Sequence, residues 1–316
     1  MTFTVTDELC GKTMLSFLRS KLKISGAALS ALKRDPKGIL VNGEHVTVRY
    51  LLREGDSIYI NELGIEDEQS ENVDPVNIPV NIVFENEDIL LIDKPPYMPT
   101  HPSHGHIDDT LANAVAYLFK ERNIPFVFRP IGRLDRNTSG ISLIAKHRIS
   151  ASFLFFARQK DMIKKRYIAL LQGEIRNDGE WQTIETYMKR QEESIIVRCV
   201  SDESEDGSFI ATTRWRLLYS NNQISVVEAE PITGRTHQLR VHFAHLGHPI
   251  IGDDVYGEAD ESIGRHALHA ASLTLPLPYG ESSKSFLSRP PEDMVDAAKK
   301  YGCDLVEIFD KEFNKA

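Results

Sequence analysis

The stretch Arg129-Pro-Ile-Gly-Arg-Leu-Asp-Arg-Asn-Thr-Ser-Gly-Ile-Ser-Leu-Ile-Ala-Lys146 lies near the middle of a chain of 316 residues. At its centre Asp135 stands between two arginines and is followed by Asn-Thr-Ser-Gly, a run of residues that favour turns. The largely apolar residues 141–145 then predict a buried strand. Cations on both sides of a carboxylate favour its charged form. Asp135 is therefore a candidate for chemistry, although the pattern also fits an aspartate that only caps its turn.

The segments around this stretch predict strands with helices between them. Strands are expected at 80–84, 89–92, 141–145, 167–171, 195–200, 211–219 and 224–230. Helices are expected after Asp109, after Ser150 and at 236–246. The last helix would bury Leu239, Phe243 and Leu246 and end at Gly247. Successive strands without regular helical crossovers favour an α+β fold with a mixed, mainly antiparallel sheet.

The first 61 residues predict a small α/β module that begins with two short helices. Met14, Leu18 and Leu22 recur every four residues, with Leu15 beside them, and this spacing predicts a helix with one apolar face. Ser25 is the expected N-cap of the second helix, because its hydroxyl can accept a hydrogen bond from a free N–H group of the first turn.

Two turns follow these helices. Asn42-Gly43 stands between apolar residues and predicts a hairpin turn in which both positions need a positive φ, and Gly55-Asp56 predicts a second turn. Two short helices followed by such turns resemble the alpha-L RNA-binding motif. The resemblance implies that Arg19, Lys33 and Arg34 contact RNA. A small α/β domain with ordinary surface cations fits the same residues.

The net charge of −9, from 37 Lys and Arg against 46 Asp and Glu, argues on its own against a nucleic-acid partner. The excess of acids is local, however. Residues 62–79 contain six acids, two prolines and no base, and they predict an extended, solvated linker. Residues 1–60 carry nine bases and six acids. The charge of the whole chain is therefore too coarse a measure to exclude RNA.

Four parts are predicted along the chain: the module at 1–61, the acidic linker at 62–79, a catalytic domain at 80–290 and a C-terminal extension at 291–316 without evident chemistry. No apolar run approaches the roughly 18 residues that a membrane span needs. The three cysteines are far apart and form no disulfide framework or zinc ribbon. We expect a soluble, cytoplasmic, monomeric protein that does not bind membranes.

The segment Gly132-Arg-Leu-Asp-Arg-Asn-Thr-Ser-Gly140 resembles the active-site signature of RluA-type RNA pseudouridine synthases. Other segments agree in the same order: Asp93-Lys-Pro-Pro, Thr100-His-Pro, Lys165-Arg-Tyr-Ile-Ala169, Gly234-Arg-Thr-His-Gln-Leu-Arg-Val-His242, His248-Pro-Ile-Ile-Gly-Asp253 and Leu268-His-Ala270. The resemblance implies an enzyme that isomerises specific uridines to pseudouridine in structured RNA. Its relatives act mostly on large-subunit ribosomal RNA and in some cases on tRNA, and the reaction needs neither cofactor nor metal.

The resemblance also assigns roles to individual residues. It implies that Asp135 is the catalytic aspartate, that Tyr167 stacks on the target uracil and that Arg240 pairs with Asp135. Arg133 matches an arginine that in some relatives enters the gap left by the flipped nucleotide. From the residues alone, Tyr167 also fits a structural strand tyrosine and Arg240 also fits a solvated charge on a helix surface.

The run Arg158-Gln-Lys-Asp-Met-Ile-Lys-Lys-Arg166 holds five bases and one acid just before Tyr167. Such a run is either a solvated basic loop or a contact for the phosphate backbone. We expect it to contact RNA through three of its bases, Lys164, Lys165 and Arg166, together with Arg133 and Arg136. Gly132 stands where the family often has a histidine.

Two other functions remain open. A non-catalytic RNA-binding or ribosome-assembly factor could keep the same fold. A metal-dependent hydrolase could use the histidine clusters at 101–106 and 237–248. Neither cluster has the HExxH spacing of zinc hydrolases, and we therefore predict no metal site.

Overall fold

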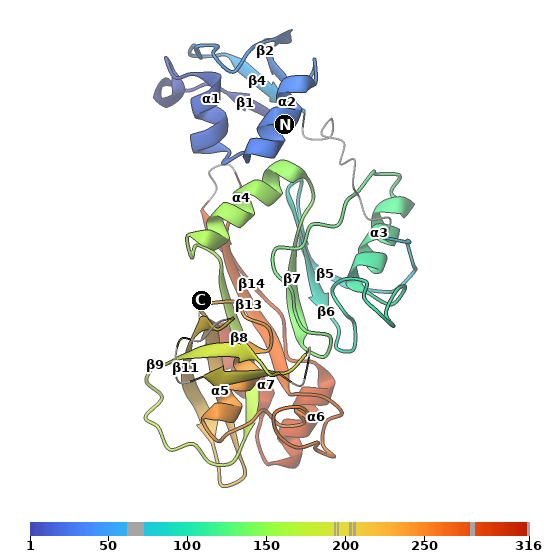
Figure 1. Cartoon of the computed structure of the whole chain (residues 1–316), viewed down its shortest axis with the longest axis vertical. Coiled ribbons are helices and arrows are strands. Elements are labelled where there is room, and N and C mark those ends of the chain that lie inside the picture. The colour runs from blue at the N-terminus through green and yellow to red at the C-terminus, as the bar shows by residue number, and fades with distance from the viewer. Residues whose placement is uncertain are drawn as a thin grey trace.

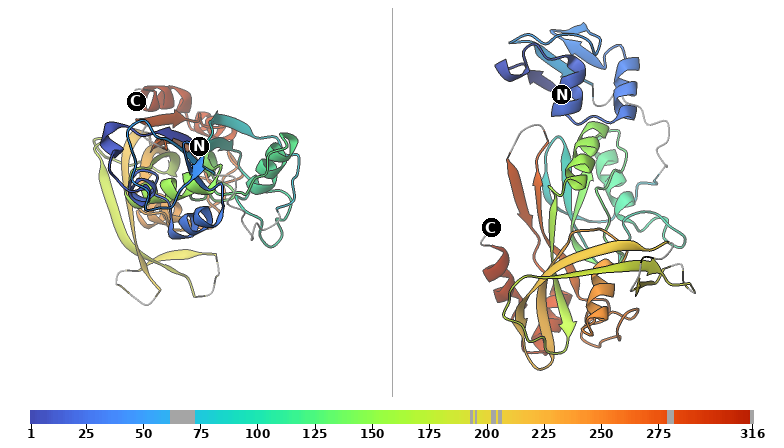
Figure 2. Two further views of the ribbon diagram at one scale, coloured as in Figure 1. Left: turned by 90° about the horizontal axis from the view of Figure 1, so that it is seen from above. Right: turned by 60° about the vertical axis from the view of Figure 1, so that its left-hand side comes forward.

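The structure is a computed structural model that describes residues 1–61, 73–192, 194, 196–201, 204, 207–278 and 282–314. The N-terminal module lies at one end of an elongated molecule, directly above helix α4 (Arg148–Gln159) of the larger body (Figure 1). The turned view shows the same stacking (Figure 2). Ile149 of α4 is completely buried and packs into the apolar core of the module. Helix α4 is thus the element of the body that packs against the module.

Within residues 1–61 the module is a four-stranded sheet with two short helices packed on it. Its elements are β1 (Thr2–Thr4), α1 (Met14–Ser16) with a π-helical continuation (Phe17–Lys21), α2 (Gly26–Arg34), β2 (Ile39–Val41), β3 (Glu44–His45) and β4 (Ser57–Ile60). The strand order is β1-β4-β2-β3. Asn42 and Gly43 have φ values of 51° and 85° in the β2–β3 turn, as the sequence predicts.

The expected apolar face of the first helix is largely confirmed. Met14, Leu18 and Leu22 are completely buried. Leu15 is 39% exposed, so the expectation that it joins this face is wrong: one residue further along a helix points about 100° away. Ser25 caps α2, because its Oγ accepts a hydrogen bond from the N–H of Ala28 at 3.2 Å.

The body is built on one large sheet. Its strands are β5 (Asn81–Glu85), β6 (Ile89–Lys94), β7 (Ser139–Ala145), β8 (Lys164–Gln172), β9 (Gln182–Arg190), β10 (Arg198–Ser201), β11 (Phe209–Ser220), β12 (Ile224–Pro231), β13 (Leu268–Pro276) and β14 (Ser283–Leu287). Among the described residues the order is β10-β9-β11-β12-β8-β13-β7-β6-β5, with β14 beside β13. These pairings are antiparallel except that of β13 with β7. The predicted α+β fold with a mixed, mainly antiparallel sheet is confirmed.

The sequence pattern does not predict β9 and β14, and β13 is indicated only at its start, where Leu268-His-Ala270 matches a segment of the family. In β9 only Ile184 and Met188 are buried, and β14 has no buried residue, so neither shows the apolar pattern of a core strand. β10 begins at Arg198, whereas the sequence predicts a start at residue 195, which lies outside the described residues. The small number of buried residues explains why sequence patterning misses β9 and β14, but it does not apply to β13, which is buried along almost its whole length.

The remaining helices are α3 (Leu111–Glu121), α5 (Gln238–His245), α6 (Glu292–Lys300) and α7 (Leu305–Phe313). In α5, Leu239 and Phe243 are buried as expected, but Leu246 is 39% exposed. It lies after the last helical residue, where Gly247 with a φ of 80° turns the chain away. In the described part of the chain, no helix is both long and apolar enough to cross a lipid bilayer.

The C-terminal helices belong to the core of the body. Met294, Leu305 and Phe313 are completely buried. They pack in the same apolar cluster as Tyr167 and Phe243, which lie on β8 and α5. The segment for which the sequence predicts only an extension is therefore integral to the fold of the domain before it.

The second half of the predicted linker is anchored to the body, while residues 62–72 lie outside the described residues. The N–H of Val76 donates to the Asn113 carbonyl at 3.2 Å, and Asn113 Nδ2 donates to the Asp74 carbonyl at 2.8 Å. Ile78 packs against the apolar cluster under α3. Residues 74–78 are thus held on α3 rather than surrounded by solvent.

Acid is expected to destabilise the body through His269 on β13. Its Nε2 donates to the Ser288 carbonyl at 3.0 Å, so in the neutral ring Nδ1 accepts from Ser139 Oγ at 2.9 Å. Burial lowers the pKa of His269 to about 4 against the opposing effect of the Ser288 carbonyl. The unfolded chain, with a histidine pKa of about 6.5, therefore binds more protons between these values.

The stability that His269 contributes above pH 6.5 is consequently lost as the pH falls toward 4. Between pH 7 and pH 5 this residue should lower the free energy of unfolding by about 2 kcal/mol, measured from urea denaturation at each pH. His269→Gln should flatten that pH dependence, while His45→Gln at an exposed position should leave it unchanged. An unchanged slope in His269→Gln would contradict the assignment.

Candidate active site

A cavity of about 470 Å³ opens between the end of α4, the loop before β7 and the start of α5. This volume lies within the range of about 300–1,000 Å³ that is usual for small-molecule sites. Asp135, Tyr167 and Arg240, which are far apart in the sequence, all line it. Its charged lining is mainly cationic and consists of Arg133, Arg158, Lys165, Arg235 and Arg240, with Asp135 and Asp161 as the carboxylates. The cavity is therefore suited to an anionic ligand such as a nucleotide.

The loop that carries Asp135 is held on both sides. Thr100 Oγ1 donates to the Leu134 carbonyl at 2.9 Å, and the Thr138 N–H donates to the Asp135 carbonyl at 3.1 Å. Gly140 has a φ of 108°, and a Cβ there would lie 2.3 Å from the Ala270 carbonyl oxygen, so β7 can approach β13 only with glycine at this position. The Asp135 side chain is 23% exposed and reaches the cavity from a fixed backbone.

Lys94 lies completely buried beneath this loop. Its ammonium group donates at 2.8–3.2 Å to three backbone carbonyls, those of Pro95, Met98 and Arg136. Burial lowers the pKa of Lys94 to about 7 and the Arg265 cation adds to this, while the Asp135 and Asp93 carboxylates oppose it. Lys94 thus fixes the residue after Asp135. The sequence shows Lys94 in the Asp93-Lys-Pro-Pro segment but not this contact.

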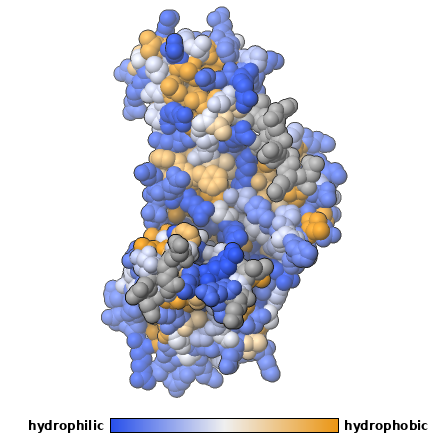
Figure 3. Space-filling view, viewed as in Figure 1, coloured by the Kyte–Doolittle hydropathy of each residue, from blue (hydrophilic) through white to orange (hydrophobic). Residues whose placement is uncertain are grey.

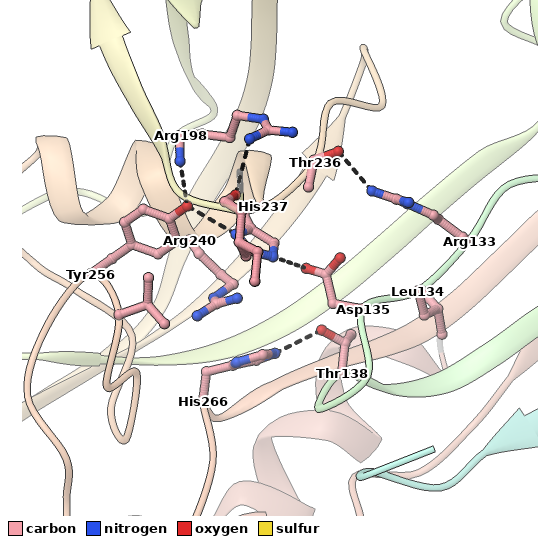
Figure 4. A network of polar contacts seen from close by, with 12 residues as sticks. Arg133, Leu134, Asp135, Thr138, Arg198, Thr236, His237, Arg240, Tyr256 and His266 are labelled. Atoms are coloured by element: carbon pink, nitrogen blue, oxygen red, sulfur yellow. Dashed lines mark hydrogen bonds and ion pairs between the residues drawn. The ribbon is translucent and has the colours of Figure 1, made fainter. Parts of the chain in front are cut away.

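His237 lies beside Asp135 at the start of α5, with a φ of 59° (Figure 4). Its Nε2 is 4.0 Å from Asp135 Oδ2, and its Nδ1 is 2.9 Å from the Tyr256 hydroxyl. The Tyr256 oxygen accepts from the Arg198 N–H at 2.9 Å, so its own hydrogen is free to donate to Nδ1. Burial lowers the pKa of His237, with Asp135 opposing. In a neutral ring whose Nδ1 accepts this hydrogen bond, the proton is on Nε2, and the Nε2–H group points toward Asp135.

Arg240 does not pair with Asp135 as the sequence implies. Its Nε and Nη2 both donate to Asp253, each at 2.7 Å, and Tyr256 lies over the guanidinium at 5.0 Å. The Asp253 carboxylate is preorganised for this, because Oδ1 also accepts from the Val255 and Tyr256 N–H groups. Burial lowers the pKa of Arg240, but Asp253 outweighs burial and raises it. The alternative of a solvated surface charge is also wrong, since Arg240 is 5% exposed.

Successive side chains of β8 point to opposite faces of the sheet, and this alternation determines which of its basic residues face the cavity. Lys165 and Tyr167 share one face and line it. Arg166 points to the other face, where it pairs with the buried carboxylate of Glu228 together with Arg216. A buried carboxylate thus engages Arg166 on the face away from the cavity, and an RNA contact of Arg166 stays a prediction. Burial raises the pKa of Tyr167, as does Asp135, so the phenol stays neutral.

Arg158 fills the space beside Gly132. A Cβ at Gly132 would lie 3.5 Å from Arg158 Nη1, and a Cβ at Gly234 would lie 3.0 Å from Nη2. The guanidinium therefore lies in the cavity between two glycines. Arg133 spans the mouth and donates from Nη2 to Thr236 Oγ1 at 2.7 Å.

The other cations predicted to bind RNA lie outside this cavity. Arg136 and Lys164 are exposed beside it. Arg19 lines a separate groove between the module and α4. Lys33 and Arg34 are in the last turn of α2, away from both hollows.

The histidines of the two sequence clusters have separate partners. His106 pairs with Asp109, His242 contacts two threonines, and His248 Nδ1 lies 2.9 Å from the Gln172 carbonyl oxygen. Across the described residues, no group of three or more His, Cys, Asp or Glu side chains is arranged to hold a metal ion.

Comparison with known proteins agrees with this geometry. Residues 88–245 match the family described as RNA pseudouridylate synthase. The match includes Asp135, Tyr167 and Arg240. The chain belongs to the RNA pseudouridylate synthase family. Its activity is the isomerisation of uridine in RNA to pseudouridine.

The similarity to known proteins extends beyond residues 88–245. An uncharacterized RNA pseudouridine synthase of Bacillus subtilis (strain 168) is 35% identical over 88% of this chain and 96% of its own length. The ribosomal large subunit pseudouridine synthase D of Borreliella burgdorferi is 35% identical over 74% of each chain. Among solved structures, the human RNA pseudouridylate synthase domain containing 1 superposes with a TM-score of 0.54 at 28% identity, over 69% of this chain and 87% of that one.

Proposed function

We propose that this pseudouridine synthase modifies uridines of large-subunit ribosomal RNA and that Asp135 is its catalytic carboxylate. The observation that carries the second part is the position of Asp135, a partly exposed carboxylate on a rigid loop in a cationic cavity. The name of the Borreliella burgdorferi relative, which refers to the large ribosomal subunit, supports the first part.

The reaction breaks the bond from ribose C1′ to N1 of uracil, rotates the base and joins C5 to C1′. A carboxylate can start it in two ways, by attacking the sugar carbon or by withdrawing a sugar proton. At the end, a base removes the proton from C5. Asp135 has the charge for both tasks and is the carboxylate held on the rigid loop of the cavity. The Nε2–H group of His237 faces it and stabilises its negative charge.

Tyr167 and the cations of the cavity would hold the extruded nucleotide. Tyr167 lies on the wall with Leu134 and Leu268 beside it, so an aromatic ring and two apolar side chains are available to a flipped base. Arg133 at the mouth and Lys165 on the wall bring positive charge to the cavity, where the phosphates on both sides of the flipped nucleotide would lie. Burial lowers the pKa of Lys165 to about 8.

The path of the RNA is proposed to continue from the cavity into the groove under the module. Arg19 and Lys23 of the module and Arg148 of α4 line this groove. Phe155 lines both the groove and the cavity, and it is 47% exposed. Apolar side chains also show at the level of α4, below the larger apolar patch of the module (Figure 3). One RNA strand could therefore contact α4 along its length.

A double variant tests this path. Arg19→Ser with Lys23→Ser should weaken RNA binding and reduce the slope of log affinity against log salt by about 2, because each phosphate contact contributes about 1. The matched control is Lys33→Ser with Arg34→Ser in the same module, which should leave the slope unchanged. Binding is measured by filter retention of a ribosomal RNA fragment at several salt concentrations. Equal slopes in both variants would contradict the proposed path.

The substrate is tested by tritium release. The protein is incubated with large-subunit ribosomal RNA, small-subunit ribosomal RNA and tRNA, each labelled with tritium at uracil C5, where the new bond forms. Release is expected from the large-subunit RNA alone. Release from tRNA alone would overturn the proposed substrate, and RNA binding without any release would favour a non-catalytic binding factor.

A further inference from the structure

We infer that Asp293 of helix α6 is a positioning residue for the loop that carries Asp135, and that it acts through Arg265. The inference rests on the proposed role of Asp135. Both residues lie outside the segment 88–245 that matches the family. They give the C-terminal helices, for which the sequence suggests no chemistry, a part in the reaction.

The pair itself is closely defined. Arg265 Nε donates to Asp293 Oδ2 at 2.7 Å, and Nη2 donates to Oδ1 at 2.9 Å. The Arg265 side chain is completely buried, while Asp293 is 34% exposed at the edge. Two parallel hydrogen bonds fix the plane of a guanidinium as well as its position. Asp293 therefore determines where the remaining N–H groups of Arg265 point.

Those remaining groups point at the catalytic loop. Arg265 Nη1 donates to the Asn137 carbonyl at 3.0 Å, and Nη2 is 3.4 Å from Ser139 Oγ. His266 Nε2 is 2.8 Å from Thr138 Oγ1, a contact drawn in Figure 4. Residues 265–266 thus hold Asn137, Thr138 and Ser139, which follow Asp135 at the end of the loop and the start of β7. Lys94 holds the Arg136 carbonyl between them and Asp135.

Helix α6 is a rigid anchor for this chain of contacts. Met294 and Ala297 are completely buried, so the helix cannot shift without opening the core. Asp293 lies in the first turn of α6, where the helix dipole favours a negative charge. It also balances the charge of the buried Arg265, and this cation contributes to the lowered pKa of the neighbouring Lys94. Through Asp293, helix α6 therefore both fixes the orientation of Arg265 at the loop and balances its charge.

Asp293→Asn tests the inference, because it keeps the shape but removes the charge and one acceptor. It should lower kcat for tritium release by about 100-fold, the effect of misplacing a reacting group by about 1 Å, and leave KM for RNA within about twofold. Asp293→Glu should recover part of kcat. Hydrogen exchange of residues 134–140, measured without RNA, should be faster in Asp293→Asn than in the wild type.

Asp310→Asn is the matched control, because Asp310 pairs with Arg289 at 2.7 Å at the exposed surface of α7 and contacts no part of the loop. It should change neither kcat nor loop exchange. An Asp293→Asn protein with wild-type kcat and wild-type exchange would overturn the inference. If the wild type releases no tritium from any RNA, the proposed function fails, whereas the exchange experiment still decides whether Asp293 holds the loop. Should Asp293→Asn not fold, Arg265→Lys, which keeps the cation but cannot form the two parallel hydrogen bonds, carries the same two measurements, and wild-type kcat and exchange in it would count against the inference.

Discussion

Asp135→Asn is expected to lower tritium release from ribosomal RNA by about 10⁴-fold or more while RNA affinity stays within about twofold of the wild type. The amide has nearly the same shape as the carboxylate, so the loop contacts of Thr100, Lys94 and Arg265 remain. It can neither attack the sugar nor accept a proton, which are the two tasks proposed for Asp135. Activity is measured at saturating RNA, and affinity by filter retention.

The cavity offers a control for this variant in Asp161. It lines the same cavity, is exposed and has a φ of 52°, a conformation that asparagine adopts readily. Asp161→Asn removes the same charge from the cavity and should change activity by less than about threefold, as expected for a screened surface charge. Equal losses in the two variants would mean that the charge of the cavity, rather than the position of Asp135, supports the reaction.

Arg240→Met is expected to lower the free energy of unfolding by about 3–5 kcal/mol, because it leaves the Asp253 carboxylate buried without its partner. The Asp253 side chain is completely buried, so water cannot replace the lost hydrogen bonds. Urea denaturation followed by circular dichroism measures the change. Arg214→Met, at an exposed pair with Glu230, should cost less than about 1 kcal/mol.

A double variant separates stability from activity at this site. Arg240→Met with Asp253→Leu removes both charges and should recover most of the lost stability, because neither buried charge is left unpaired. Tritium release should remain low, since the cation that faces the cavity beside Asp135 is still missing. Full recovery of both properties would show that Arg240 has a purely structural role.

Much of the fold can be predicted from local patterns. The turn at Asn42-Gly43, the cap at Ser25 and the buried strand after Asp135 depend on neighbouring residues alone, so sequence and structure agree there. Errors arise where a residue's environment is set by distant segments. Leu246 is apolar but exposed, because α5 ends before it and no element among the described residues covers it.

In the candidate site, too, the motifs could be read from the sequence, whereas the contacts between distant segments could not. Ordered motifs identify Asp135, Tyr167 and Arg240, and the structure brings all three to one cavity. The partner of Arg240 could not be read from the sequence, because Asp253 becomes the nearest carboxylate only when the turn after α5 folds back. The sequence shows His237 only as a member of a histidine cluster and of the motif around Arg240, because neither its positive φ nor its distance to Asp135 is visible in the chain.

The sequence predicted the α+β class from its apolar patterns, and its motifs pointed to the family and to Asp135 through their resemblance to known segments, because patterns and motifs depend on residues close together in the chain. The tertiary structure alone decided which charges face the cavity and which face the core. Arg166 and Lys165 are adjacent, yet β8 turns one toward buried Glu228 and the other toward the cavity. It also linked Asp293 through Arg265 to the loop that carries Asp135. Arg265 and Asn137 are more than 100 residues apart in the sequence, and their contact depends on how the sheet and α6 pack.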